Sequence, residues 1–88
     1  MRILKFPLEV RDRQSVLIPC AAKILSIQVQ HGVPVIWALC DDSSVLSEHR
    51  YIDMYGTGEK IKGDPGDHIG TFQMEGGDLV FHAFEGRS

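Results

Sequence analysis

The sequence has few cysteines, no long apolar run and no segment that keeps a helical period. Its apolar stretches fall far short of the roughly 20 residues that a membrane-spanning helix needs. The stretch Met1 to Pro7 is too short for the apolar core of a signal peptide. We therefore expect a soluble, cytoplasmic protein without a membrane partner, and no amphipathic helix in its fold.

A strong charge of one sign is also missing. Nine Lys and Arg residues and twelve Asp and Glu residues give a formal net charge of −3, and the basic residues form no run. A protein that binds duplex nucleic acid needs a basic surface, so that class of partner is not expected. A small anionic or nucleotide ligand remains compatible with this composition, because a few local donors can hold it.

Motifs for metal binding and catalysis are absent as well. The four histidines form no HxH or HxxxH pair, and Cys20 and Cys40 lack CxxC spacing. We expect no metal and no cofactor, and reduced thiols, with a Cys20–Cys40 disulfide as the alternative in an oxidising compartment. The GxSxG and GxxxxGK[ST] motifs are missing too, so no residue is assigned a catalytic role. A small enzyme that uses His82 or His68 with an aspartate is the weaker alternative.

What the sequence does contain is a series of short β-type runs separated by turn residues. Leu25, Ile27 and Val29 alternate with polar residues, as in a strand with one buried face. A chain of 88 residues supports one core, so residues 1–88 are expected to form a single all-β domain, an antiparallel sandwich or a partly open barrel. About seven strands are predicted, over residues 2–8, 15–18, 23–30, 33–40, 49–55, 67–74 and 78–84.

The predicted strand at residues 33–40 is apolar on both faces. Such a strand is central in its sheet or lies against another subunit. Because a small β domain with exposed sheet edges often gains burial by self-association, we expect a homo-oligomer. Its interface is predicted to include Val35, Trp37 and Leu39, with Trp37 as the main anchor.

A candidate ligand loop follows the strand at residues 49–55. In Gly56-Thr57-Gly58 the backbone amides could approach an anion closely, and Lys60 would add charge. The alternative is a turn that only ends the strand. The preceding strand offers a guanidinium for a phosphate and phenol rings for a base. The complete set of candidate ligand-binding residues is Arg50, Tyr51, Tyr55, Thr57, Gly58, Lys60 and His82.

These residue types also have structural interpretations. Arg50, Tyr51 and Tyr55 could form a solvated strand face with cross-strand packing. His82 lies among the phenylalanines of the final strand and could be a hydrogen-bonded core histidine instead of a group that lines a pocket. The sequence alone leaves both interpretations open.

Taken from end to end, the chain resembles a family of small proteins of unassigned function from phages, prophages and bacterial genomes. The segments that carry the resemblance are residues 3–10, 22–30, 32–34, 37–39, 55–58, 69–73 and 79–85. The resemblance assigns no catalytic residue. It implies a phage accessory protein that acts by stoichiometric binding, either by sequestering a nucleotide immune signal or by blocking a host protein.

We therefore expect a non-enzymatic binding protein that captures a small ligand. The alternative is a structural or interaction module that pairs with a host or phage protein through a sheet edge, for which the first strand, which contains Pro7, is the candidate.

Overall fold

The computed structural model describes residues 1–43 and 45–87 and consists of seven strands and one short 3₁₀ turn. Ser44, in the loop predicted to follow the strand at 33–40, lies outside the described residues, as does Ser88. The elements are β1 (Arg2–Pro7), β2 (Arg13–Pro19), β3 (Lys23–Gln30), β4 (Val33–Cys40), β5 (Ser47–Gly56), β6 (Asp67–Met74), η1 (Glu75–Gly77) and β7 (Leu79–Gly86).

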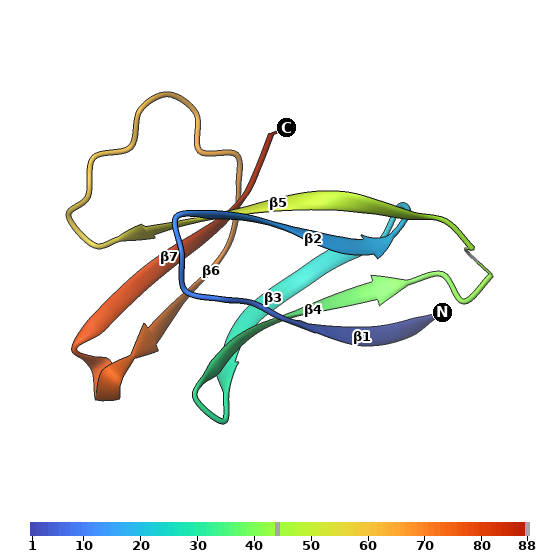
Figure 1. Ribbon diagram of the computed structural model, residues 1–88, viewed down its shortest axis with the longest axis horizontal. Helices are drawn as coiled ribbons and strands as arrows, with labels where there is room; N and C mark the ends of the chain where they lie inside the picture. The colour runs from blue at the N-terminus through green and yellow to red at the C-terminus, as the bar shows by residue number, and fades with distance from the viewer. Residues whose placement is uncertain (44, 88) are drawn as a thin grey trace.

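The strands form two antiparallel sheets, one of three strands in the order β1-β4-β3 and one of four in the order β2-β5-β7-β6. Figure 1 shows the two open sheets, with β1 and β3 on either side of β4 in one, and β2 and β6 as the edge strands of the other. The expected all-β class is confirmed. No α-helix occurs in the described part of the chain, and no helix there is long and apolar enough to span a membrane.

Two of the predicted hairpin turns are held by residues with positive φ. His31 and Gly32 have φ values of 52° and 79°, and they join β3 to β4 as a two-residue hairpin. Such a turn matches the right-handed twist of the strands that it connects. Gly76 and Gly77, with φ values of 65° and 99°, form the turn between β6 and β7. Both turns were expected from their glycines.

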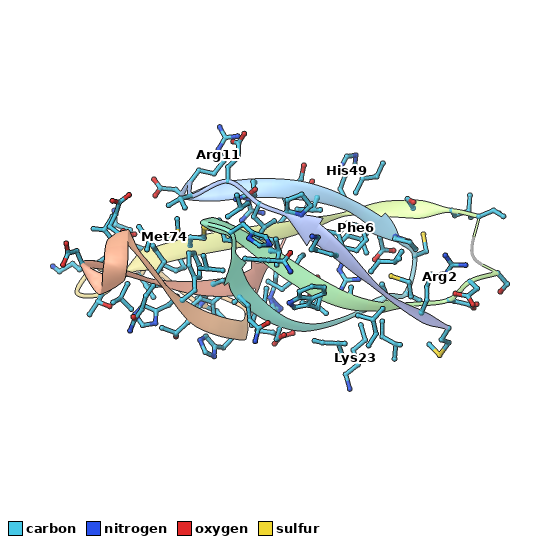
Figure 2. All side chains as sticks on the ribbon, turned by 90° about the horizontal axis from the view of Figure 1, so that it is seen from below. Arg2, Phe6, Arg11, Lys23, His49 and Met74 are labelled. Carbon is cyan, nitrogen blue, oxygen red and sulfur yellow. The ribbon has the colours of Figure 1, made fainter. Side chains whose placement is uncertain are left out.

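The core lies between the two sheets. On β4, Ile36, Ala38 and Cys40 point inward and are almost completely buried. From the opposite sheet, the inward residues include Ile18, Ile52, Met54, Phe72 and Ala83. Figure 2 shows this arrangement from the side, with Phe6 between the layers and with His49 and Lys23 on opposite outer faces. β4 is the central strand of its sheet, in agreement with its two apolar faces.

Each sheet has two edge strands, and two of these edges lie close together. β3 bonds only to β4 and β6 only to β7, yet Gly70 of β6 packs directly on β3. A Cβ atom at Gly70 would lie 2.9 Å from Cγ2 of Ile27. The absence of a side chain therefore permits the close approach of the two sheets at this point.

The predicted strand ends are correct for β3, β4 and β6, whereas β2 and β5 are longer than expected. β2 begins at Arg13 instead of Ser15, and β5 begins at Ser47 instead of His49. The two strands pair over seven residues, from Arg13 opposite Asp53 to Pro19 opposite Ser47. Pairing between the strands, and not an apolar pattern, extends both elements into polar sequence. β7 begins at Leu79 and continues to Gly86, where the prediction ended at Phe84.

Candidate functional site

The outer face of the four-stranded sheet brings together residues from three strands and one loop. Tyr55 of β5 lies opposite His82 of β7, which in turn lies opposite Thr71 of β6. In the next row, Phe84 of β7 lies opposite His68 of β6. We call this surface the His82 face, made up of Tyr55, Thr57, His68, Thr71, His82 and Phe84.

Both ring nitrogens of His82 form hydrogen bonds with threonine hydroxyls. Oγ1 of Thr57 is 2.8 Å from Nε2 of His82, and Oγ1 of Thr71 is 2.9 Å from Nδ1. The Thr71 hydroxyl also lies 3.4 Å from Nε2 of His68, at the long end of the hydrogen-bond range. A chain of polar groups therefore crosses the face from the loop after β5 to the edge strand β6.

Aromatic rings lie beside these hydroxyls. Phe84 contacts Tyr55 edge-on, with ring centroids 5.8 Å apart, and contacts the imidazole of His68 at 5.1 Å. The residues of the His82 face are half-buried or exposed. A shallow groove of about 290 Å³, lined by Gly56, Thr57 and residues 78–81, adjoins the face. The surface is open, so a ligand would lie on the sheet and not inside an enclosed cavity.

A second cluster occupies the β2 side of the same outer face. Nη1 of Arg13 donates to both carboxylate oxygens of Asp53, at 3.1 and 3.0 Å, and the guanidinium lies 4.7 Å from the centroid of the Tyr51 ring. Asp53 is only 7% exposed. A Cβ atom at Gly86 would lie 2.0 Å from Oδ2 of Asp53, so this glycine makes room for the ion pair. Tyr51 is therefore in contact with a cation supplied by its own chain.

Arg50, the guanidinium proposed for a phosphate, points away from the other candidates into the space between the sheets. Its Nε donates to Oε2 of Glu85, and its Nη2 donates to Oε1 of the same carboxylate at 3.0 Å. Its third nitrogen, Nη1, donates to the carbonyl of Ala22 at 2.9 Å. The Arg50 and Glu85 side chains are 16% and 24% exposed. The hydrogen bonds with Glu85 raise the pKa of Arg50, while burial opposes this rise. Arg50 thus connects β5, β7 and the turn before β3.

Gly58 and Lys60 lie in the exposed loop of residues 57–66, outside the sheet. The start of the loop is fixed by a hydrogen bond from the Thr57 amide to the carbonyl of Val80, and by one from the Glu59 amide to the carbonyl of Gly56. Gly58 has a φ of 89°. Among the seven predicted ligand residues, Tyr55, Thr57 and His82 are therefore close together, Tyr51 is on the same outer face, and Arg50 is on the opposite one.

The predicted interface residues lie on the outer face of the three-stranded sheet. Val35 is 3% exposed, and Nζ of Lys5 on β1 donates to Oε1 of Gln30 on β3 at 2.7 Å, so these two side chains meet across β4. The Trp37 indole donates to Oε1 of Gln28 at 3.2 Å. Trp37 and Leu39 remain half-buried. Their role in a homo-oligomer stays a prediction.

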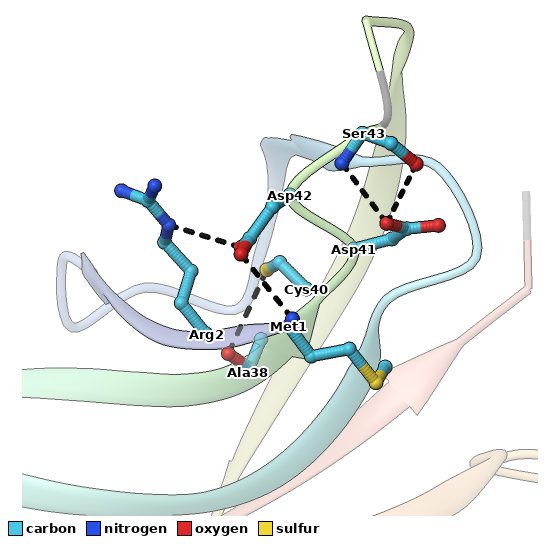
Figure 3. Close-up of polar contacts among 7 residues, drawn as sticks. All are labelled: Met1, Arg2, Ala38, Cys40, Asp41, Asp42 and Ser43. Atoms are coloured by element: carbon cyan, nitrogen blue, oxygen red, sulfur yellow. Dashed lines mark hydrogen bonds and ion pairs between the residues drawn. The ribbon is translucent and has the colours of Figure 1, made fainter.

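The cysteines and acidic residues near the N-terminus do not form a site of their own. Cys20 and Cys40 are free thiols, and desolvation, with a contribution from Glu48, raises the pKa of Cys20. Figure 3 shows the amino group of Met1 and the guanidinium of Arg2 on the carboxylate of Asp42, whose pKa they lower. These contacts attach the start of β1 to the end of β4. No group of three metal-ligating side chains occurs within residues 1–43 and 45–87.

A family model described as "Domain of unknown function (DUF7352)" matches residues 1–88. The chain belongs to this family. No curated protein and no solved structure gives a significant match. The expected membership of an uncharacterised family is confirmed, whereas an origin in phages or prophages stays a prediction. The description of DUF7352 names no activity, so the function has to be inferred from the side chains.

Sequence reasoning did not include His68, Thr71 and Phe84 of this DUF7352 domain in the site. The alternation along each strand did carry a signal, because it placed His82 and Phe84 on one face of the last strand. Alternation does not show which residues of neighbouring strands lie opposite one another. The pairing of Tyr55, His82 and Thr71 in one row depends on the registers of β5, β6 and β7.

Proposed function

We propose that this protein is a non-enzymatic binding protein that captures a small anionic or nucleotide ligand on its His82 face. One observation carries the proposal: Thr57 and Thr71 form hydrogen bonds with both ring nitrogens of His82 on a surface that also carries aromatic rings. Sheet faces with rings and polar groups suit nucleotides, because bases stack on rings and polar groups orient them.

Two further features support a small anion over a long polyanion. Lys60 and Lys62 are exposed in the loop that begins at Thr57, where they could approach a negatively charged group. The net charge of −3 disfavours binding to an extended nucleic acid. A single phosphate or phosphodiester needs only a few local donors.

Binding is favoured over catalysis by the chemistry of the face. A histidine that acts as a general base usually has one ring nitrogen oriented by a carboxylate or carbonyl group and the other free for the substrate. In His82 both nitrogens are engaged by neutral hydroxyls. This arrangement holds the ring still and presents hydroxyls, which suits recognition of a ligand.

The resemblance to phage and prophage proteins gives this role a biological setting. We propose that the protein acts in the host cytoplasm as an accessory protein that sequesters a nucleotide immune signal. Capture of this kind is stoichiometric, so a small domain without a reaction centre is sufficient. The support for this setting is the resemblance alone, whereas the ligand class is supported by the His82 face.

A thermal-shift screen tests the proposal. At a ligand concentration of about 100 times Kd, selective binding to the folded state stabilises it by about 2.7 kcal/mol. We expect at least one compound among mononucleotides, cyclic nucleotides, cyclic dinucleotides and sugar phosphates to raise Tm. The Thr57→Val and Tyr55→Ala variants should reduce this shift, because each removes a contact group from the His82 face.

The matched control is His49→Ala, which changes an exposed histidine on the same sheet, opposite Leu17 and away from the face. It should leave the shift unchanged. A compound whose shift is equal in the parent and in both His82-face variants would contradict the proposed location of the site.

An interaction module is the second candidate function, and the edges of β3 and β6 favour it. Each strand has one hydrogen-bonded neighbour, and a groove of about 510 Å³ between them is lined by residues 27–29 and 71–73. Open strand edges can pair with an extended peptide of a host or phage protein. The sequence favoured the β1 edge for this role, whereas the groove lies at the opposite side of the sandwich. If the protein is an interaction module, no small ligand in the thermal-shift screen should raise its Tm.

A further inference from the structure

The hydrogen bonds of His82 restrict what its two threonine partners can offer to a ligand. A neutral imidazole has one N–H donor and one acceptor nitrogen. One threonine must therefore accept a hydrogen bond from the ring, and the other must donate its hydroxyl proton to the ring. Only the accepting threonine keeps a proton that it can donate outward. With a neutral His82, the pair Thr57 and Thr71 presents a single hydroxyl donor to a ligand.

Protonation of His82 changes this count. An imidazolium ion has two N–H donors, so Thr57 and Thr71 would then both accept hydrogen bonds from the ring. Both hydroxyl protons are then released from the ring, on either side of a positive charge, and an oxyanion competes with Nε2 of His68, 3.4 Å away, for the proton of Thr71. An oxyanion such as a phosphodiester has only acceptors, so the protonated arrangement, with two donors and a positive charge, binds it more tightly than the neutral arrangement with one donor.

The titratable and charged groups that face His82 are compatible with its protonation. On β5 the ring lies opposite Tyr55, and the nearest carboxylate of that strand, Asp53, is already paired with Arg13. On β6 the second imidazole, His68, lies 3.4 Å from the Thr71 hydroxyl. The other charged groups near Thr57 are Glu59, whose Oε1 accepts from the Gly56 amide at 3.4 Å, the exposed Lys60 and, in the adjoining groove, Asp78.

We propose that Thr57, His82 and Thr71 form an oxyanion site in which binding of the anion is coupled to proton uptake by His82. This inference rests on the proposed function and specifies the chemistry of its ligand, a phosphomonoester or phosphodiester group. The aromatic rings of Tyr55 and Phe84 would contact the remainder of the ligand. The coupling makes the affinity for the anion fall as pH rises.

The test uses cyclic AMP and adenosine as a matched pair of probes. They share the base and the ribose ring, but cyclic AMP adds a phosphodiester whose single negative charge is constant over the range of pH used. Between about pH 8 and about pH 5.5, where histidine titrates, the affinity for cyclic AMP should rise by about tenfold or more. The affinity for adenosine should stay constant. Calorimetry in buffers of different ionisation enthalpy should detect net proton uptake with cyclic AMP only.

The His82→Asn variant should remove the pH dependence of cyclic AMP binding, whereas His49→Asn, at an exposed histidine away from the face, should retain it. Since a variant could perturb the sheet, the titration of the His82 ring is also followed by NMR in the unaltered protein. Its midpoint should move to higher pH when cyclic AMP is added. Cyclic AMP binding on the His82 face with equal affinity at both pH values would overturn this inference and leave the proposed function intact. The absence of binding by every compound of the screen would overturn both.

Discussion

Replacement of Arg50 with alanine is expected to lower the free energy of unfolding by about 2–4 kcal/mol. The substitution leaves the Glu85 carboxylate, which is 24% exposed, without its main partner, and it also leaves the Ala22 carbonyl without its donor. For a domain of this size, Tm should fall by about 10–20 °C. Chemical denaturation measures the change directly.

The control for this prediction is Arg11→Ala, because Arg11 forms an exposed ion pair with Glu9. Exposed pairs contribute little, so this variant should change the stability by less than about 1 kcal/mol. A double-mutant cycle between Arg50 and Glu85 should give a coupling energy of about 1 kcal/mol or more. A stable Arg50→Ala protein that has lost ligand binding would instead assign Arg50 to the site.

The Gly66→Ala variant is expected to be destabilised by about 2–4 kcal/mol. Gly66 ends the loop of residues 57–66 with a φ of 95°, where an L-amino acid is strained. A Cβ atom at this position would also lie 2.1 Å from the backbone carbonyl oxygen of Glu85. The backbone must therefore move, and with it the attachment of the loop to β7.

Gly63→Ala provides the matched comparison within the same loop. Gly63 has a φ of 75°, but a Cβ atom there would have no atom within 4 Å apart from those of its two chain neighbours, so only the backbone strain of about 1 kcal/mol applies. In thermal unfolding, the Tm of Gly66→Ala should therefore be clearly lower than that of Gly63→Ala. Equal losses of stability would show that the contact between Gly66 and β7 does not hold the loop.

The strands could be predicted well where alternation and turn residues agree. β3 and β4 are flanked by the His31-Gly32 turn, and both match their predicted bounds. The extra residues of β2 and β5 could not be predicted, because polar residues such as Arg13 and Glu48 carry no apolar signal. Their place in the sheet comes from pairing with a strand more than 25 residues away in the sequence.

The site was predictable only in part, since alternation assigns side chains to a face but not to a neighbour. Tyr55, Thr57 and His82 were chosen separately for their chemistry, and strand register is what brings them together. Alternation also placed Arg50 opposite Tyr51 and Tyr55 on its strand. Its partner Glu85 is 35 positions further along the chain, where no local pattern could reveal the ion pair.

Mapping of backbone amide chemical shifts with a compound from the screen tests the central claim, that the His82 face holds the ligand. We predict that the largest changes occur at Tyr55, Thr57, Thr71 and His82, with smaller changes in the loop that carries Lys60. Changes confined to residues 27–29 of β3 or to the outer face of the three-stranded sheet would contradict this account.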